Sequence, residues 1–577
     1  MRLRLGLTLA LIVTACTSSE PTTTSSTAPA TDDTATTSGQ PSPVDLSQRP
    51  LVWINPQPYT LIREVFEGGS VDFLDMFPTD APWLEAAGHV HVFKLYDELG
   101  LGRVAPNEEW SQAIEGISQR RMALALELGP LKTGQGCGGG EGYGTNHSLD
   151  QVRKVQRLGG RVDVVAFGSP YGFGHLWDDP RDDPCHWSVE RVAAETSEFV
   201  SRLREIEPNV VVGGIEPLWV GMTAANLAEW MDAYEAAAGE PLGFLHLDVD
   251  WNRHDWPEVA LEVEAEARAR GVPFGMIYNG GDQFQDDEGW AQATADRMYL
   301  YEEVAGGRPD HVVIQSWFVQ PARVLPDTDP SSLTGLINRY LGARTQLDVS
   351  TDGVSINARL TTIDGVPVSG GSLTLEAIPI DGIPQTLERH GTVPDDVDMA
   401  EVGIRLNTEG GGPGAADLLV YEVGYYDDGD TTNRVSDPTF GYLAQFEIPG
   451  VSVDDLGGRS VLRLTVDAGQ EVNLGTNRFP VTPGTAYRLE VQAAVPGDSA
   501  EAGFAVVVFF RGENEMARHI LALAPAAVSL AEVVTGSSGE IHLDPIDLEP
   551  GRYVIRIGYR GDLDHWPAYF EQEVTLE

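Results

Sequence analysis

Basic residues are scarce in this sequence, which has 38 lysines and arginines against 87 aspartates and glutamates in 577 residues and a formal net charge of -49. A protein that binds nucleic acid needs a basic face to neutralise phosphates, so this composition excludes a nucleic-acid partner. A strongly acidic surface keeps a protein soluble at high ionic strength, where salt screens repulsion between its charges. The composition is therefore compatible with a saline habitat, but it identifies no partner.

The chain also lacks any apolar run long enough to cross a bilayer as a helix. The best candidate, Leu5–Val13, is too short to span the hydrocarbon core. It follows Arg2 and Arg4 and precedes a group of small residues, and this order is typical of a secretory signal. We expect residues 1–15 to be a cleaved signal peptide.

The four residues Val13-Thr14-Ala15-Cys16 resemble the lipobox of bacterial lipoproteins. The resemblance implies that Cys16 carries a diacylglycerol and anchors the protein, outside the cytoplasm, to the cell membrane or cell surface. Residues 16–49 are almost entirely Thr, Ser, Pro, Ala, Gly and Asp, and they are expected to form a disordered tether. The alternative is an ordinary signal peptide with a bystander cysteine.

Cysteine is rare, and only Cys137 and Cys185 remain once Cys16 carries lipid. An even pair in an oxidising compartment predicts a disulfide between them. A zinc site is the weaker alternative because, apart from His186, neither cysteine has a neighbouring cysteine or histidine at zinc-finger spacing.

Residues 50–343 contain eight short apolar runs that alternate with helical patterns, at the spacing of one βα unit each. The runs are Leu51–Asn55, Val90–Tyr96, Met122–Leu128, Val162–Phe167, Asn209–Ile215, Phe244–Asp250, Phe274–Asn279 and His311–Trp317. Eight such units predict an α/β fold, the (β/α)8 TIM barrel, rather than a doubly wound open sheet.

After residue 344 the pattern changes to short β-like runs separated by Gly, Pro, Asp and Asn, which predicts an all-β sandwich region. On the alternating runs Val354–Leu360 and Ser372–Ala377, residues 344–398 resemble part of an immunoglobulin-like sandwich. The strand expected near Glu549–Ile557 could complete this sandwich or the one that follows it.

Residues 399–577 resemble jelly-roll carbohydrate-binding modules on the patterns Val402–Glu409 and Asn477–Leu489. A turn at Pro-Gly followed by alternating Tyr and Leu also describes other sandwich strands. The sequence leaves open whether one β domain is inserted into the other.

A TIM barrel carries its functional groups at the carboxyl ends of its strands, and alternation along each strand decides which side chains point inward. This alternation predicts that five side chains point into the barrel: Glu127, Glu216, His246, Asp248 and Asp250. The other strand ends and their following loops add Asn55, Lys94, Tyr96, Trp219, Trp251, Asn279, Gln315 and Trp317 as candidate substrate contacts.

The mouth of the barrel, at the carboxyl ends of its strands, would then be lined by carboxylates, amides and aromatic rings, and such a lining is suited to bind a sugar. Glycosidic cleavage needs one protonated and one charged carboxyl group, and Glu127, Glu216, Asp248 and Asp250 are the candidates. We expect Glu216 to be the acid/base and Asp248 or Asp250 to be its partner. The alternative for each acid is a structural ion pair, for instance with Lys94.

Metal binding is the weaker hypothesis for the same region. Asp248 and Asp250 with His246 and His254 could hold a divalent cation, but no helical His-Glu spacing or third clear ligand accompanies them. We expect no metal and no other cofactor.

Two long loops are expected over the mouth, after the third and fourth strands. A disulfide between Cys137 and Cys185 would join them and hold Tyr143, His175 and Trp177 as further candidate substrate contacts. The alternative is that the disulfide only restrains two long loops, with the aromatic residues packed beneath it.

The barrel resembles that of glycoside hydrolases, on its strand-end carboxylates, tryptophans and appended β modules. The largest clan of such barrels places glutamates at the ends of strands four and seven, whereas these strands here end Phe167–Pro170 and Tyr278–Gly280. The resemblance implies a cell-surface glycoside hydrolase acting on an extracellular poly- or oligosaccharide. The alternatives are a non-catalytic glycan-binding lipoprotein and, more weakly, an adhesin whose β modules bind proteins.

Overall fold

The computed structural model describes residues 50–576 with short internal gaps. The gaps are residues 63–65, 97–104, 133–144, 178–184, 220, 252, 254, 282–285, 317–318, 352–354, 381, 383, 408–414, 428–429, 437, 440–448, 456–459, 468–470, 496–502, 513, 524–525, 545–547 and 549. The expected signal peptide and tether, and the predicted roles of Cys16, Cys137, Tyr143, His254 and Trp317, lie outside the described residues. In the part that is described, no helix has the length and apolar character needed to span a membrane.

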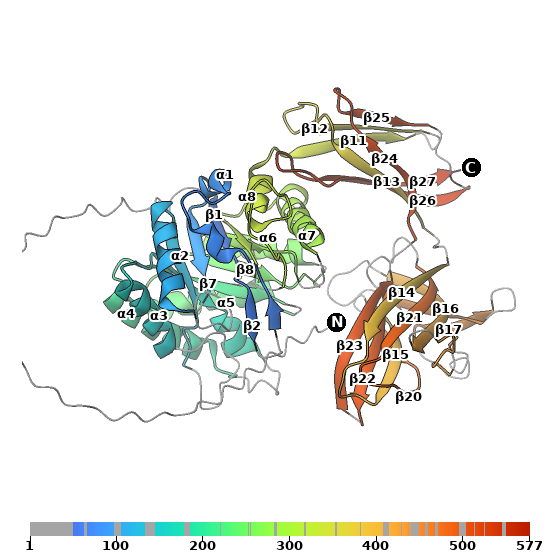
Figure 1. The fold of residues 1–577 in the computed structure, drawn as a ribbon, viewed down its shortest axis with the longest axis horizontal. Coiled ribbons are helices and arrows are strands. Elements are labelled where there is room, and N and C mark those ends of the chain that lie inside the picture. The colour runs from blue at the N-terminus through green and yellow to red at the C-terminus, as the bar shows by residue number, and fades with distance from the viewer. Residues whose placement is uncertain are drawn as a thin grey trace, which may run out of the picture.

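Eight parallel strands close into a barrel in the order β1-β10-β9-β8-β7-β6-β5-β4, which confirms the predicted TIM barrel (Figure 1). The strands are β1 (Leu51–Asn55), β4 (Val92–Leu95), β5 (Ala123–Leu128), β6 (Val164–Gly168), β7 (Val211–Leu218), β8 (Leu245–Val249), β9 (Phe274–Tyr278) and β10 (His311–Gln315). A small hairpin of β2 (Thr60–Ile62) and β3 (Phe66–Gly68) follows the first strand.

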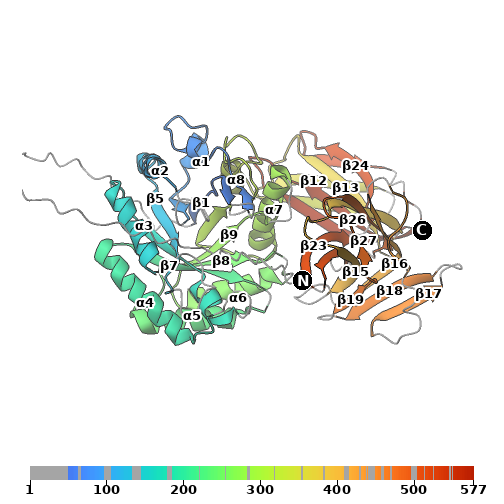
Figure 2. The same cartoon turned by 60° about the horizontal axis from the view of Figure 1, so that its bottom comes forward.

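Helices surround the barrel (Figure 2). They are α1 (Leu84–Ala87), α2 (Asn107–Gln119), α3 (Thr145–Arg157), α4 (Val189–Ile206), α5 (Ala224–Ala238), α6 (Trp256–Ala269), α7 (Asp287–Tyr299) and α8 (Leu333–Leu341), with the shorter η1 (Phe73–Met76), η3 (Gly172–Leu176) and η4 (Leu300–Val304). Side-chain caps explain several starts: Ser188 accepts a hydrogen bond from the amide of Arg191, and Thr223 forms a capping box with Asn226.

The two faces of the barrel strands pack into two different apolar cores. The inner core, inside the barrel, includes Trp53, Val92, Ala125 and Ile215. The outer core, between strands and helices, includes the alternate residues of the same strands, such as Val212 on β7. Membership in one core or the other therefore tells which way each strand residue points.

The β region consists of two sandwiches, one inserted into the other. The host sandwich packs the sheet β11-β12-β25 against β24-β13-β26-β27 around its own core. Its strands are β11 (Thr345–Thr351), β12 (Ile356–Thr362), β13 (Ser372–Pro379), β24 (Val528–Val534), β25 (Glu540–Leu543), β26 (Gly551–Tyr559) and β27 (Ala568–Leu576).

The inserted sandwich lies between β13 and β24 in the sequence and has a separate core. Its sheets are β14-β21-β16-β18-β17 and β19-β15-β22-β23, with β20 paired to β15. The strands are β14 (Gln385–Thr392), β15 (Met399–Asn407), β16 (Ala415–Asp427), β17 (Val451–Asp455), β18 (Ser460–Asp467), β19 (Glu471–Gly475), β20 (Phe479–Pro480), β21 (Ala486–Ala494), β22 (Gly503–Arg511) and β23 (Asn514–Leu523).

This topology answers the question that the sequence left open. Strands β24 and β26 both pair with β13, so residues from Val528 onward complete the first sandwich rather than the second. The expected division at residue 399 is therefore not where the sheets divide, because β14 already pairs with β21 of the insert.

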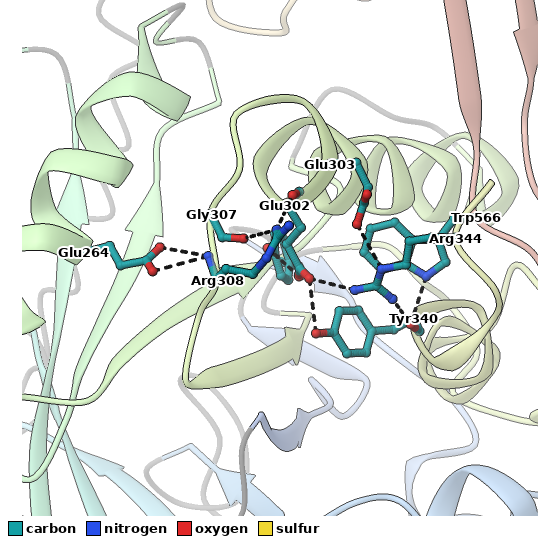
Figure 3. A network of polar contacts seen from close by, with 9 residues as sticks. Glu264, Glu302, Glu303, Gly307, Arg308, Tyr340, Arg344 and Trp566 are labelled. Atoms are coloured by element: carbon teal, nitrogen blue, oxygen red, sulfur yellow. Dashed lines mark hydrogen bonds and ion pairs between the residues drawn. The ribbon is translucent and has the colours of Figure 1, made fainter. Parts of the chain in front are cut away.

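A polar network fixes the host sandwich to the barrel (Figure 3). Arg344, between α8 and β11, forms ion pairs with Glu302 and Glu303 of η4 at 2.9 and 3.0 Å. Its guanidinium lies 3.6 Å from the ring centre of Trp566, whose indole nitrogen donates to the carbonyl of Tyr340 at 2.9 Å. Trp566 comes from the segment between β26 and β27 and is buried in the barrel's outer core.

Candidate active site

The carboxyl ends of the barrel strands bring several predicted polar residues to one mouth. Asn55 is the last residue of β1, and Lys94 and Glu127 are the next-to-last residues of β4 and β5. Each points to the same side of its strand as the inner-core residue two positions earlier, namely Trp53, Val92 and Ala125. On β8, β9 and β10 the inward polar residues are Asp248, Asn279 just after the end of β9, and Gln315. The inward direction predicted for these side chains from the alternation along each strand is therefore confirmed.

Lys94 and Glu127 form an ion pair at the mouth. Lys94 is fully buried, so its ammonium requires an anionic partner, and the Glu127 carboxylate supplies it. The Glu127 side chain keeps 18% of its surface exposed. Glu127 is therefore a fixed carboxylate that still reaches the solvent.

Asp248 lies on the same mouth, partly exposed, and its carboxyl holds its proton unusually well. Loss of solvation, together with the negative charges of Glu127 and Asp250, raises the pKa of Asp248 to about 7. The charge of Lys94 and the amide of the Asn279 side chain act in the opposite direction. A carboxyl group with this pKa is suited to donate a proton near neutral pH.

Asn279 and Trp251 connect the loops that follow β9 and β8. The Trp251 indole nitrogen donates to Asn279 Oδ1 at 2.7 Å, and the amide of Gly281 donates to the same oxygen at 2.9 Å. Arg297 of α7 donates to the Asn279 carbonyl and lies 4.2 Å from the Trp251 ring centre. Arg297 was not among the residues predicted from the sequence, although an arginine on the otherwise mostly apolar buried face of α7 is a signal that could have indicated it.

Glu216 does not face the mouth, so the prediction that it points inward is wrong. Its neighbour Ile215 belongs to the inner core, which turns Glu216 toward the helices. It is fully buried, and its two carboxylate oxygens accept hydrogen bonds from the backbone amides of Tyr171 and Gly172, both at 2.9 Å. Glu216 thus caps the start of η3.

His246 is also unsuited to the predicted contact with substrate. It points inward as expected but is fully buried below the mouth, where its Nε2 lies 2.9 Å from His311 Nδ1 and its ring packs edge-on against Trp53. Burial, together with the charges of His311 and Lys94, lowers the pKa of His246 well below its usual value. The ring is therefore neutral and belongs to the barrel interior.

Three other predicted residues define the shape of the mouth. The Tyr96 hydroxyl donates to the carbonyl of Ser316 at 2.8 Å, and Asn55 Nδ2 donates to the carbonyl of Lys94 at 2.9 Å. Asn55 and Gln315 are register partners on neighbouring strands. Their side-chain oxygens are buried and have no hydrogen-bond partner within the described part of the chain.

An aromatic cluster lies beside the ends of β6 and β7. Phe173, Trp177 and Trp219 contact one another with ring centres 5.4 to 5.8 Å apart, and both tryptophans are partly exposed. His175 is bound to the backbone instead, with Nδ1 2.6 Å from the carbonyl oxygen of Trp187. Trp177 and Trp219 are therefore the predicted rim contacts that remain available.

Cys185 is buried, and its sulfur is disulfide-bonded. Because Cys137 lies outside the described residues, the pairing of these two cysteines stays a prediction. Among the described residues no group of three or more His, Cys, Asp or Glu side chains could hold a metal ion.

Comparisons with known proteins found no matching family and no matching curated protein. Among solved structures, N2152 from Neocallimastix frontalis matches with a TM-score of 0.33 at 13% identity, over 72% of this chain and 92% of that one. An α-L-arabinofuranosidase from Thermotoga maritima, in an arabinose complex, matches with a TM-score of 0.32 at 10% identity, over 78% and 97%. A truncated 3-deoxy-D-arabino-heptulosonate 7-phosphate synthase from the same organism matches with a TM-score of 0.28 at 12% identity, over 50% and 85%. Matches at this level carry no argument about activity.

Proposed function

We propose that the protein is a glycoside hydrolase that cleaves an extracellular poly- or oligosaccharide, with Asp248 as the acid/base and Glu127 as the charged carboxylate. The observation that carries the proposal is the contrast between these two acids at one mouth. Asp248 has a pKa of about 7, whereas Glu127 is held against the buried ammonium of Lys94. Two carboxyl groups in opposite protonation states are what glycosidic cleavage requires.

The reaction follows from these two states. Protonated Asp248 donates its proton to the glycosidic oxygen as the bond from that oxygen to the anomeric carbon breaks. The Glu127 carboxylate stabilises the positive charge that develops on the sugar ring. Water then supplies hydroxide to the anomeric carbon, and its remaining proton returns to Asp248.

Other groups at the mouth suit the binding of a sugar. The partly exposed rings of Trp177, Trp219 and Trp251 offer apolar faces on which a pyranose can stack.

The proposal is tested with the mature protein on a panel of plant, algal and bacterial glycans. We expect Asp248→Asn and Glu127→Gln each to reduce turnover about 100- to 10,000-fold, the range that general acid–base groups contribute. Asp286→Asn is the matched control, because this exposed acid caps α7 and asparagine caps a helix equally well. Binding of a glycan with no release of reducing ends would instead establish the non-catalytic alternative, which the absence of strand-end glutamates on β6 and β9 favours.

The pH dependence of the wild type gives a second prediction. Asp248 must be protonated to act as an acid, so kcat/KM should fall as the pH rises through about 7, where the carboxyl loses its proton. This alkaline limit should be absent from any residual activity of Asp248→Asn. A wild-type activity that stays constant from about pH 5 to about pH 9 would contradict the assignment.

A further inference from the structure

Helix α7 lies on the side of the barrel that meets the host sandwich (Figure 1, Figure 2). Gln292, Asp296 and Tyr299 occupy positions i, i+4 and i+7 of this helix and therefore share one face of it. All three contact the segment from Arg560 to Tyr569 of the sandwich. This face of α7 is thus a surface through which the sandwich holds the barrel.

The contacts on this face centre on Tyr569 of β27. Its hydroxyl donates to Asp296 Oδ1 at 2.5 Å, and its ring meets that of Tyr299 edge-on with ring centres 5.6 Å apart. Gln292 Nε2 donates to the same aspartate oxygen at 2.8 Å and to the carbonyl of Arg560 at 3.0 Å. Burial raises the pKa of Asp296, and the hydrogen bonds from Tyr569 and Gln292 lower it again. The sandwich therefore supplies one of the donors that stabilise the charge of Asp296.

The next residue of α7 is held by the mouth of the barrel instead. Successive residues of an α-helix are about 100° apart around its axis, so Arg297 does not share the face of Asp296. The guanidinium of Arg297 donates to the carbonyl of Asn279 and lies 4.2 Å from the ring centre of Trp251. One buried cation thus restrains the loops that follow β8 and β9.

The first turn of α7 reaches a third loop of the mouth. Asp287 Oδ1 accepts the backbone amide of Ala322, which follows β10, at 2.8 Å. The same helix therefore contacts three loops at the carboxyl ends of the strands and, by another face, the host sandwich. Because closely packed elements transmit displacements, a shift of α7 at Asp296 also displaces Arg297.

We propose that the host sandwich is part of the active site, with Tyr569 as a positioning residue that holds α7 and thereby fixes the Trp251 ring at the mouth. This inference rests on the proposed function in that it takes Trp251 as a surface on which a sugar ring stacks. Tyr569 acts on Trp251 through Asp296 and Arg297, which are neighbours on one helix. The sandwich then contributes to substrate binding as well as to the stability of the chain.

Kinetics of the mature protein test this role. Tyr569→Phe removes the hydroxyl that donates to Asp296 and keeps the ring that meets Tyr299. A displaced stacking surface weakens the binding of substrate and transition state alike. We therefore expect KM to rise about three- to tenfold and kcat to change less than about twofold.

Tyr559→Phe is the matched control for a weakened sandwich. The Tyr559 hydroxyl donates to Asp562 Oδ2 at 2.8 Å within the host sandwich, so the variant removes an equivalent bond that involves no residue of α7. It should leave KM unchanged. An equal rise in KM in both variants would reflect the stability of the sandwich and would overturn the proposal.

A double-mutant cycle tests the path through Arg297. Arg297→Lys keeps the charge but loses the planar guanidinium that reaches both the Asn279 carbonyl and the Trp251 ring. If Tyr569 acts through Arg297, adding Tyr569→Phe to Arg297→Lys should raise KM less than about twofold further. Effects on KM that multiply in full would show that the two residues act independently, against the proposal.

A measurement without substrate separates this inference from the proposed function. Fluorine NMR of protein labelled with fluorotryptophan reports the surroundings of each indole, and Trp251→Phe assigns the Trp251 signal. We expect Tyr569→Phe to shift or broaden this signal and Tyr559→Phe to leave it unchanged. An unchanged Trp251 signal in Tyr569→Phe overturns the inference, whether or not the protein cleaves glycans. A displaced signal in a protein that releases no sugar supports the link between sandwich and mouth and rejects only the hydrolase.

Discussion

Glu216 and Asp248 are carboxylates on neighbouring strands, and their surroundings give them different roles. Both carboxylate oxygens of Glu216 accept hydrogen bonds from backbone amides, so the protein already occupies this group. Asp248 lies among other acids and has lost solvent, which favours its neutral form. A proton donor therefore has to be sought at Asp248.

Glu216→Gln tests the capping role. Glutamine has one acceptor oxygen, so it can satisfy only one of the two amides of Tyr171 and Gly172, and its NH2 group faces the other. We expect the free energy of unfolding to fall by about 1 to 3 kcal/mol, the cost of leaving a buried donor unsatisfied. The measurement is denaturant unfolding, with turnover per folded molecule as the companion assay. A stable variant with greatly reduced turnover would return Glu216 to the catalytic site.

At the scale of single elements, the eight barrel strands were predictable because each is a short apolar run followed by a helical pattern. The direction of most strand-end residues was predictable too, because large apolar residues alternate with alanine or polar residues on β5 and β8. On β7 both faces are apolar and two glycines interrupt the pattern, so its parity could not be determined from hydrophobicity. The strand also continues to Leu218, beyond the predicted end at Ile215.

The contacts that complete the candidate site could not be predicted, because they join residues far apart in the sequence. The amides of Tyr171 and Gly172 reach Glu216 only once β6 and β7 are neighbours. Arg297 reaches Trp251 only when α7 packs against the loop after β8. The insertion of one sandwich into another was equally hidden, since strand pairing leaves no local signal.

The junction around Arg344 provides a prediction at this scale. Glu302 has 5% of its side-chain surface exposed, and burial raises its pKa to about 7, while Arg344 and hydrogen bonds from Tyr278 and Tyr340 oppose the rise. Arg344→Met removes the only one of these partners that carries a positive charge. We expect it to lower the free energy of unfolding by about 3 to 5 kcal/mol where Glu302 is ionised.

The pH dependence of this effect has a definite sign. Removing Arg344 raises the pKa of Glu302 further in the folded state, so the variant loses stability relative to the wild type as the pH rises through about 7 and beyond. At about pH 5 both proteins keep Glu302 protonated, and the difference should be small. Denaturant unfolding at the two ends of this range measures it. Arg556→Met is the control, because it breaks an exposed ion pair with Glu571 and should cost less than about 1 kcal/mol at either pH.

For the whole molecule, the lipid anchor is the prediction with the largest consequence for where the protein works. Cys16→Ser removes the thiol that would carry the diacylglycerol, and no described helix could replace it as an anchor. We expect the variant to be recovered in the soluble extracytoplasmic fraction and the wild type to need detergent. Fractionation followed by immunoblotting checks this, and detergent-dependent recovery of the variant would contradict the lipoprotein assignment.

The insertion of one sandwich within the other has a mechanical consequence. Residues 380–384 lead from β13 into the insert, and residues 524–527 lead back to β24. These strands pair antiparallel, with Ala377 opposite Val528, so both crossings leave the host at the same end of the same pair. If the N-terminus is anchored and the insert holds a ligand, the two connecting segments share the tension between them. The tension then pulls both strands in one direction, instead of peeling a single terminal strand from its sheet.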